Sequence, residues 1–220
     1  EAALVLRESG FERGRVELRA LREERAVLPD LPPLDADELT VGELVEERRA
    51  RLHERPGIRL VADEALRRDA RAALPFTLTG AQKRAVREIA EDLGSGRAMA
   101  RLLQGDVGSG KTAVAALALL LAARNRTQGA LMAPTEVLAE QHAETLAKLL
   151  GGAGVRLALL TGRVRGPARR SLLAALEAGA IDVLVGTHAL VETPVKFRRL
   201  SLVVVDEQLE IANPRGIRAA

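Results

Sequence analysis

Leu102-Leu-Gln-Gly-Asp-Val-Gly-Ser-Gly-Lys-Thr112 is a glycine-rich segment with a short apolar run at its start and a long apolar stretch after it. Its spacing matches the P-loop pattern G-x-x-x-x-G-K-[ST]. The glycines let the chain fold tightly, so that successive N–H groups and the N-terminus of the next helix point at a phosphate, while Lys111 adds a positive charge. Thr112 can ligate Mg²⁺. The segment therefore predicts nucleotide binding by Gly105, Asp106, Val107, Gly108, Ser109, Gly110, Lys111 and Thr112.

Two adjacent carboxylates follow another apolar run. Leu202-Val-Val-Val-Asp206-Glu207 places them at the C-terminal end of a buried strand, where ligands of open α/β sheets bind. Asp206 is predicted to hold the magnesium ion. Because successive strand residues point in opposite directions, Glu207 is the better candidate for orienting an attacking water. The predicted catalytic residues are thus Lys111, Asp206 and Glu207, and an acidic strand end that faces solvent is the alternative interpretation of the two carboxylates.

Around the P-loop, short apolar runs alternate with helical stretches, which is typical of βαβ units and a parallel sheet. The stretch after Lys111 is apolar on nearly every side, as expected for a helix that packs on the sheet and is covered by neighbours. We therefore predict an α/β domain with three layers, α/β/α, and a mostly parallel sheet. The predicted strands are Ala100–Gln104, Ala130–Ala133, Arg156–Leu160, Ile181–Val185 and Leu202–Val205, and the predicted helices are Ala81–Leu93, Lys111–Arg124, Glu136–Leu150 and Pro167–Glu177.

The N-terminal part is charge-dense and ends its first 34 residues with Leu28-Pro-Asp-Leu-Pro-Pro33. Prolines lack an N–H donor and disfavour helix before them, so this part is predicted to be a linker after a short helix. Apolar residues among Glu and Arg predict an amphipathic helix over Asp37–Arg55 that stops at Pro56. The predicted organisation is a charged, proline-rich linker over 1–36, a helical linker over 37–73, the P-loop domain over 74–208 and a tail over 209–220.

Composition excludes several classes of site. The 220 residues contain no Cys, and their three His residues are not at zinc-ligand spacing. The basic residues are mostly Arg, which grips phosphate with two hydrogen bonds and permits a polyanionic partner. Recognition by stacked aromatic rings is not expected, because Tyr and Trp are absent. The longest apolar stretch is too short to cross a bilayer and no secretion signal is seen, so we expect a cytoplasmic protein without membrane contact; the initial Glu1 suggests a processed start or a fragment.

Five segments between Leu74 and Gln208 resemble consecutive motifs of the RecG family of bacterial ATP-dependent DNA helicases. The resemblance is weaker over 37–73 and absent over 1–34. It implies a RecA-like motor domain of superfamily 2, which uses ATP and Mg²⁺ to translocate on duplex DNA and to remodel forks and Holliday junctions in recombination and repair. The segments are Leu74-Pro-Phe-Thr-Leu-Thr-Gly-Ala-Gln82, Leu102 to Thr112, Met132-Ala-Pro-Thr-Glu-Val-Leu-Ala-Glu-Gln-His142, Val185-Gly-Thr-His-Ala-Leu190 and Asp206-Glu-Gln208.

The resemblance also implies DNA contacts in loops that follow strands, at Pro134, Thr135, Thr161, Gly162, Thr187 and His188. Thr135 at a helix N-terminus could present its hydroxyl and backbone donors to a phosphate, although an ordinary helix cap would use the same residue. His188 could equally be a satisfied loop histidine. Basic residues after Thr161-Gly162 could form a phosphate-binding stripe, in which we include Arg163 and Arg165 with Arg169 and Arg170.

Gln82 and Phe76, with Thr79, resemble the adenine-side motif of such helicases, in which an amide pairs with the base edge and an apolar ring packs on the base. The alternative interpretation is that Gln82 is an ordinary surface residue and Phe76 an ordinary buried one. We keep both residues as candidates for nucleotide binding.

After Gln208 the sequence departs from the family, and the DExH pattern lacks its His. The next strand of the family, which lies between the P-loop strand and the Asp-Glu strand, is missing, so a gap in the centre of the sheet is expected. A second RecA-like domain with an arginine finger and a wedge domain for branched DNA are also missing. We therefore expect a monomeric chain that binds ATP without unwinding DNA alone. A P-loop ATPase or kinase acting on a small molecule and a non-catalytic DNA-binding fragment remain the alternatives.

Overall fold

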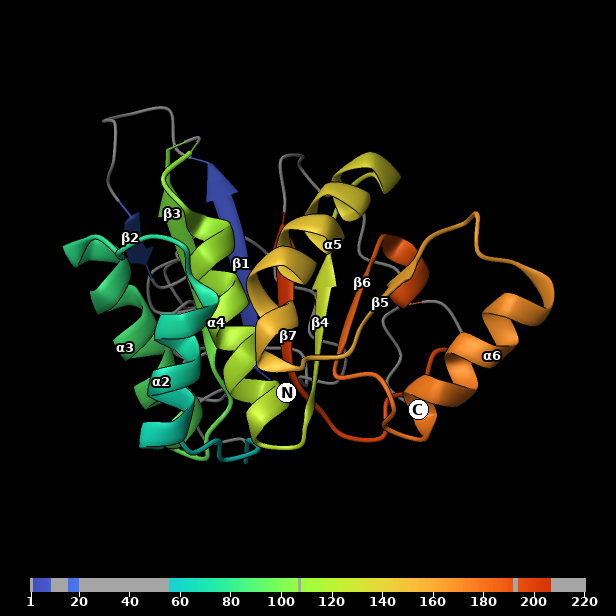
Figure 1. Cartoon of the computed structure of the whole chain (residues 1–220), viewed down its shortest axis with the longest axis horizontal. Helices are drawn as coiled ribbons and strands as arrows, with labels where there is room; N and C mark the ends of the chain where they lie inside the picture. Colours follow the sequence, from blue (N-terminus) through green and yellow to red (C-terminus); the bar gives the residue numbers. More distant parts are fainter. Residues whose placement is uncertain (1, 9–15, 20–55, 107, 192–193, 207–220) are drawn as a thin grey trace, which may run out of the picture.

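A seven-stranded sheet runs through the computed structural model of the chain, which describes residues 2–8, 16–19, 56–106, 108–191 and 194–206 (Figure 1). Its strand order is β2-β3-β1-β7-β4-β6-β5, and every neighbouring pair is parallel except β2 with β3. The predicted mostly parallel sheet is thus confirmed. The strands are β1 (Ala2–Glu8), β2 (Val16–Arg19), β3 (Ala100–Gly105), β4 (Gln128–Met132), β5 (Leu157–Leu160), β6 (Val183–Gly186) and β7 (Leu200–Asp206).

Helices cover both faces of the sheet. Leu131, Val183 and Leu202 belong to a core shared with α3, α4 and α5. Ala130 and Leu184 point the other way and form a second core with α6, as expected from the alternation of side chains along a strand. The predicted three-layer α/β/α architecture is confirmed. The helices are α2 (Glu64–Ala73), α3 (Gly80–Gly94), α4 (Lys111–Arg124), α5 (Glu136–Leu150) and α6 (Gly166–Glu177), with short 3₁₀ turns η1 (Gly151–Ala153) and η2 (His188–Leu190).

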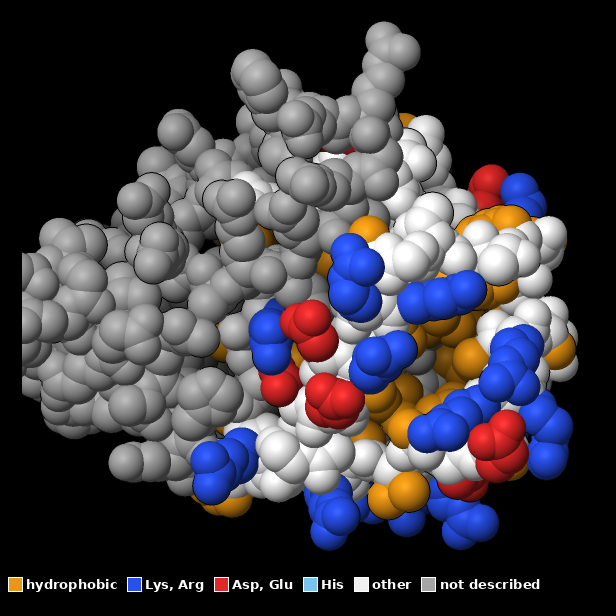
Figure 2. Space-filling view, turned by 90° about the vertical axis from the view of Figure 1, so that its left-hand side faces the viewer, with side chains coloured by type: hydrophobic (Ala, Val, Ile, Leu, Met, Phe, Trp, Pro, Cys, Tyr) orange, Lys and Arg blue, Asp and Glu red, His pale blue; other side chains and the backbone are white. Residues whose placement is uncertain are grey.

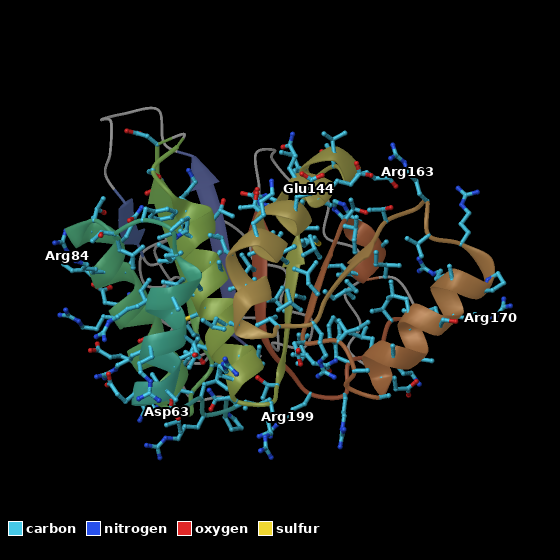
Figure 3. All side chains as sticks on the ribbon, viewed as in Figure 1. Asp63, Arg84, Glu144, Arg163, Arg170 and Arg199 are labelled. Atoms are coloured by element: carbon cyan, nitrogen blue, oxygen red, sulfur yellow. The ribbon has the colours of Figure 1, made fainter. Side chains whose placement is uncertain are left out.

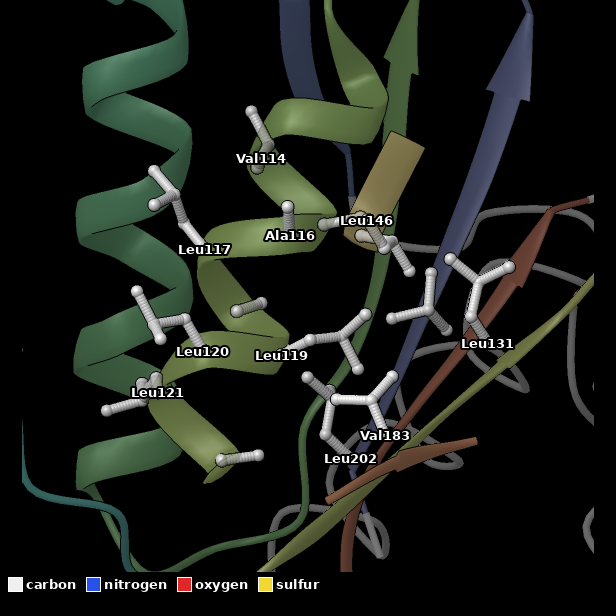
Figure 4. Close-up of a cluster of buried hydrophobic side chains, with 14 of the residues drawn as sticks. Val114, Ala116, Leu117, Leu119, Leu120, Leu121, Leu131, Leu146, Val183 and Leu202 are labelled. Carbon is white, nitrogen blue, oxygen red and sulfur yellow. The ribbon is translucent and has the colours of Figure 1, made fainter. Parts of the chain in front are cut away.

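Helix α4 forms the centre of the larger core. It contacts α2, α3 and α5 as well as the sheet, which explains why its sequence has no polar face. Figure 4 shows Leu119 between the helix and the strands that carry Leu131 and Leu202. The approach is close, because a Cβ atom on Gly129 of β4 would lie 2.5 Å from Leu119 Cδ2. Glycine at this position lets α4 pack directly against β4.

The N-terminal strands correct the prediction for residues 1–34. The predicted helix and linker are wrong where β1 and β2 form, and β1 lies between β3 and β7, where a gap was expected. The apolar run Ala2-Ala-Leu-Val-Leu6 is short and is surrounded by charge, which hides it from a reading of the average composition. Between β3 and β7 such a run gains backbone hydrogen bonds on both sides, and unpaired backbone groups are costly in a sheet.

The segment before α3 packs on the larger core. Leu60 and Leu66 are buried against it, and the Asn125 side chain at the end of α4 exchanges hydrogen bonds with the backbone of Val61. The helix predicted over Asp37–Arg55 and the tail over 209–220 lie outside the described residues, and the divisions at 36, 73 and 208 stay predictions. Among the helices that the structure describes, none has the length and apolar character to cross a membrane.

Candidate active site and nucleic-acid interface

The P-loop has the strand-loop-helix context that its sequence predicts. β3 ends at Gly105 and α4 begins at Lys111. Gly108 and Gly110 have φ angles of 76° and 84°, in the left-handed region that glycine adopts without strain. Gly110 is the N-cap of α4 and supplies no side-chain hydrogen bond. The start of α4 is therefore free of a competing side-chain cap, as an anion site requires. Val107 lies outside the described residues.

The polar groups of the loop fit a phosphate ligand. The Lys111 side chain is buried, and its Nζ donates to the carbonyl oxygens of Gly105 and Asp106 at 2.7 and 3.0 Å. Two buried oxygens, Asp106 Oδ2 and Ser109 Oγ, have no hydrogen-bond partner within the part of the chain that the structure describes. Buried polar atoms are normally paired. The Ser109 hydroxyl can donate to a phosphate oxygen, whereas the Asp106 carboxylate oxygen only accepts and suits a cation or a proton donor. Within the described residues, carbonyl oxygens are the groups that hold the lysine amine, and it can exchange them for a phosphate.

Gln82 links α3 to the P-loop. Its Oε1 accepts a hydrogen bond from the Thr79 backbone N–H at 2.9 Å, and its Nε2 donates to the Ser109 carbonyl oxygen at 2.7 Å. The side chain is buried, so the surface interpretation is wrong. Phe76 is 49% exposed, which also contradicts a buried Phe and leaves its ring accessible to a base. The adenine contacts of both residues stay predictions.

Asp206 lies at the same edge of the sheet as the P-loop. Strand β1 pairs with both neighbours, with Glu8 opposite Gly105 and Leu6 opposite Asp206. One strand therefore separates the start of the P-loop from Asp206, which corresponds to about 10 Å across the sheet. This arrangement permits Thr112 of α4 and Asp206 to serve one metal ion between them. Glu207 lies outside the described residues.

A histidine that sequence reasoning did not select reaches this carboxylate. Nε2 of His142, on α5, lies 2.5 Å from Oδ2 of Asp206. The two side chains are only 13% and 17% exposed. His142 ends one of the segments that resemble the helicase family, but helical periodicity alone does not tell which strand end faces it.

The predicted DNA loops meet at the neighbouring part of the same edge. Met132 of β4 pairs with Gly186 of β6, and Gly186 also pairs with Leu160 of β5. The loops at Pro134-Thr135, Thr161-Gly162 and Thr187-His188 directly follow these three strands. The structure thus brings the predicted DNA residues together beside the nucleotide residues, as the parallel sheet requires.

The individual side chains of these loops differ in accessibility. Thr135 caps α5 by accepting from the Leu138 N–H at 3.3 Å, so the ordinary cap is present. His188 is exposed and Thr187 is half-buried. Thr161 is 2% exposed, and its hydroxyl is not presented to solvent. Exposed Gly162 can offer its backbone instead.

The basic stripe is interrupted. Arg163 lies beside α5 (Figure 3), where its Nε is 3.0 Å from Glu136 Oε2 and one terminal nitrogen is 2.9 Å from Glu140 Oε1. Arg165 donates to the Gly162 carbonyl oxygen, and Arg170 lies farther away on α6 (Figure 3). The phosphate-binding stripe therefore stays a prediction, and in this structure Arg163 is paired with two carboxylates that a phosphate would have to displace.

Charge alone does not single out the side of the molecule that has the candidate DNA loops. Figure 2 shows Lys and Arg side chains over the face formed by α2 and α3, at the other end of the sheet from β5. Arg67 is 3.6 Å and Arg71 is 4.0 Å from Glu64, so part of this charge is paired within α2. The exposed basic residues of these helices are Arg67, Arg68, Arg71, Lys83, Arg84 and Arg87.

Comparisons with known proteins agree with this geometry. The family model described as DEAD/DEAH box helicase matches residues 79–216. The ATP-dependent DNA helicase RecG of Bacillus subtilis (strain 168) is 54% identical over 162 residues, which cover 73% of this chain and 24% of that protein. RecG of Treponema pallidum (strain Nichols) is 54% identical over 135 residues, which cover 61% of this chain and 20% of that protein. A solved structure of RecG bound to a three-way DNA junction matches with a TM-score of 0.67 and 35% identity, over 73% of this chain and 25% of that one.

The chain therefore spans about a quarter of the length of the relatives that it matches. The matched residues include the P-loop, Asp206 and all three candidate DNA loops. Since the family model covers more than half of the sequence, the chain belongs to the DEAD/DEAH box helicase family.

Proposed function

We propose that the chain is the first motor domain of a RecG-type ATP-dependent DNA helicase, which remodels forks and Holliday junctions in recombination and repair. One observation carries the proposal. The P-loop, Asp206 and three candidate DNA loops share the carboxyl edge of one sheet. ATP bound at one half of this edge is then adjacent to DNA at the other half. Similarity to a RecG structure that holds a three-way junction supports a branched substrate.

The nucleotide half has a defined task for each residue. Lys111 leaves the carbonyl oxygens of Gly105 and Asp106 and binds the β- and γ-phosphates of ATP. Thr112 and Asp206 are the residues that would hold Mg²⁺, which supplies charge stabilisation at the phosphate oxygens when bound. Glu207 orients the attacking water. Gln82 and Phe76 contribute on the adenine side.

The candidate DNA loops, at the other half of this sheet edge, contact the DNA backbone and not the bases. Thr135, Gly162, Thr187 and His188 offer hydroxyl, backbone and imidazole donors, which suit phosphate oxygens. Pro134 fixes the chain before the α5 cap. Binding is therefore independent of base sequence. A monomeric state, a cytoplasmic location and the lack of membrane contact belong to the same proposal.

The isolated chain binds ATP but turns it over slowly. In RecG-like helicases a second RecA-like domain supplies an arginine finger, and such a finger contributes roughly 10³ to 10⁵ in rate when supplied in trans. The competing functions are a small-molecule ATPase or kinase and a non-catalytic DNA-binding fragment. The RecG relatives favour the helicase over both.

Calorimetry with Mg-ATP tests the nucleotide site. Lys111→Ala should weaken binding because it removes the charge at the phosphates, whereas Lys148→Ala, on an exposed position of α5, should not. Equal affinity of the wild type and Lys111→Ala would refute the site. In the longer protein, forked DNA should stimulate ATP hydrolysis, and Glu207→Gln should stop hydrolysis while sparing binding. A lack of stimulation by DNA would favour the small-molecule alternative.

A further inference from the structure

Asp206 is held by a helix as well as by its own strand. Its Oδ2 is 2.5 Å from Nε2 of His142, which lies midway along α5. Within the part of the chain that the structure describes, His142 is the one side chain hydrogen-bonded to this carboxylate. Among the described residues, none forms a hydrogen bond to the other oxygen, Oδ1.

The His142 side chain is held in place by its helix. Asp206 is the last residue of β7 that the structure describes. The ring of His142 is 13% exposed and belongs to a helix that is anchored by buried Ala139, Ala143 and Leu146. The imidazole is therefore the fixed partner, and it sets the rotamer of the carboxylate.

The contact fits an imidazole that carries a proton on Nε2. Nε2–H then donates to Oδ2, and the carboxylate keeps its single negative charge, which its Oδ1 can offer to a metal ion. Metal-ligating carboxylates are commonly oriented by such a second hydrogen bond, and losing the partner typically costs 10- to 100-fold in metal affinity or activity.

We propose that His142 is a positioning residue that holds Oδ2 of Asp206 so that Oδ1 faces the magnesium ion of the bound nucleotide. This inference rests on the proposed function, because it needs a nucleotide at the P-loop. His142 itself does not touch the nucleotide or the metal.

The test separates metal binding from nucleotide binding. Mn²⁺ replaces Mg²⁺ as a spectroscopic probe, and its affinity for the complex of the chain with a non-hydrolysable ATP analogue is measured by electron paramagnetic resonance. The affinity of the analogue alone is measured by calorimetry in excess chelator. His142→Ala should lower the Mn²⁺ affinity about 10- to 100-fold. The affinity of the metal-free ATP analogue should change less than about twofold.

Three further variants make the outcome specific. His142→Gln places an amide donor near the position of Nε2 and should restore most of the Mn²⁺ affinity, whereas His142→Asn is too short to reach and should resemble His142→Ala. Thr145→Ala, an exposed change on the same helix, should behave as wild type. Thermal unfolding shows which variants are folded. If His142→Ala is not folded, the comparison of His142→Gln with His142→Asn tests the role of His142 instead.

The outcomes distinguish the two proposals. Wild-type Mn²⁺ affinity in His142→Ala or His142→Asn, with the analogue still bound, overturns the role of His142 and leaves the helicase proposal intact. Failure of His142→Gln to exceed His142→Asn also overturns it. If the wild-type chain binds no analogue, the proposed function fails, and the inference from His142 falls with it.

Discussion

The Gln82 side chain packs so closely on Gly110 of the P-loop that no side chain fits at position 110: a Cβ atom there would lie 2.3 Å from Nε2 of Gln82. The Gln82 amide cannot simply turn aside, because its Oε1 accepts from Thr79 and its Nε2 donates to Ser109. The N-terminus of α3 therefore braces the phosphate-binding loop. Glycine at position 110 is required by this contact as well as by its φ angle of 84°.

Gly110→Ala should lower the free energy of unfolding more than Gly108→Ala does. Both positions have positive φ, a conformation that costs roughly 1 to 3 kcal/mol for such a residue, but a Cβ on Gly108 meets nothing within 4 Å. The difference in the free energy of unfolding between the two variants, measured in urea, gives the cost of the clash with Gln82. Adding Gln82→Ala to Gly110→Ala should recover part of the loss, and equal stability of the two glycine variants would contradict the brace.

The contact between Leu119 and Gly129 predicts non-additive effects. Leu119→Ala removes a fully buried side chain and should cost about 2 to 5 kcal/mol. Gly129→Ala should cost about 1 to 3 kcal/mol, because its methyl group overpacks the core against Leu119. In the double variant the new methyl enters the space that Leu119 leaves, so the total should be smaller than the sum of the two. Denaturant unfolding of the four proteins measures this coupling, and simple additivity would disprove it.

Asp182 and Arg156 predict a loss of stability in acid. Burial raises the pKa of Asp182, but hydrogen bonds and charge attraction from Arg156 outweigh it and lower the pKa below its usual value. Stability from such a carboxyl is fully present above the unfolded pKa, about 3.9, and is lost as pH falls through the folded pKa.

The Asp182→Asn variant checks this sign. It should be less stable than wild type near pH 7 by about 1 kcal/mol, a small value because the Arg156 side chain is largely exposed. The difference should shrink below about pH 4, since protonation removes the same charge from the wild type. Unfolding curves from pH 3 to 7 measure it, and a difference that stays constant with pH would contradict the assignment.

Local sequence signals predicted most of the domain. Helices α4 and α5 begin and end at the predicted residues, because local signals define them: Gly110 and Thr135 mark the starts, and a continuous apolar stretch in α4 and periodic apolar residues in α5 follow. Strands β3 to β7 are near their predicted bounds for the same reason. Pairing partners are not local. β1 was missed because its place depends on β3 and β7, which come about a hundred or more residues later.

The candidate site also has a part that the local sequence predicts and a part that depends on tertiary contacts. The P-loop is one continuous segment, so its sequence contains most of its geometry. The bond from His142 to Asp206 joins residues 64 apart, and the contact of Arg163 with Glu140 joins residues 23 apart. A run of Arg residues predicts phosphate binding only if no carboxylate is folded against it. That condition belongs to the tertiary structure.

Arg163 and its two glutamates predict that DNA binding improves when the carboxylates are removed. In the wild type Arg163 is paired with Glu136 and Glu140 on α5, so a DNA phosphate must displace them. Arg163→Ala alone should therefore change the affinity for duplex DNA only slightly. The Glu136→Gln/Glu140→Gln variant frees the guanidinium and should raise the affinity several-fold. Each added phosphate contact should steepen the slope of log affinity against log salt by about 0.9.

Fluorescence anisotropy with a labelled duplex over a range of salt concentrations measures both effects. Glu144→Gln is a control for the general effect of charge, because it removes one negative charge from the exposed side of α5, half of what the double variant removes, at a residue that does not contact Arg163 (Figure 3). Adding Arg163→Ala to the double Gln variant should cancel most of the gain and flatten the slope by about one unit. All variants should bind unrelated duplex sequences equally, since phosphates carry no base information. If the double Gln variant gains no more than Glu144→Gln, or keeps its gain without Arg163, these glutamates do not restrain the DNA-facing surface.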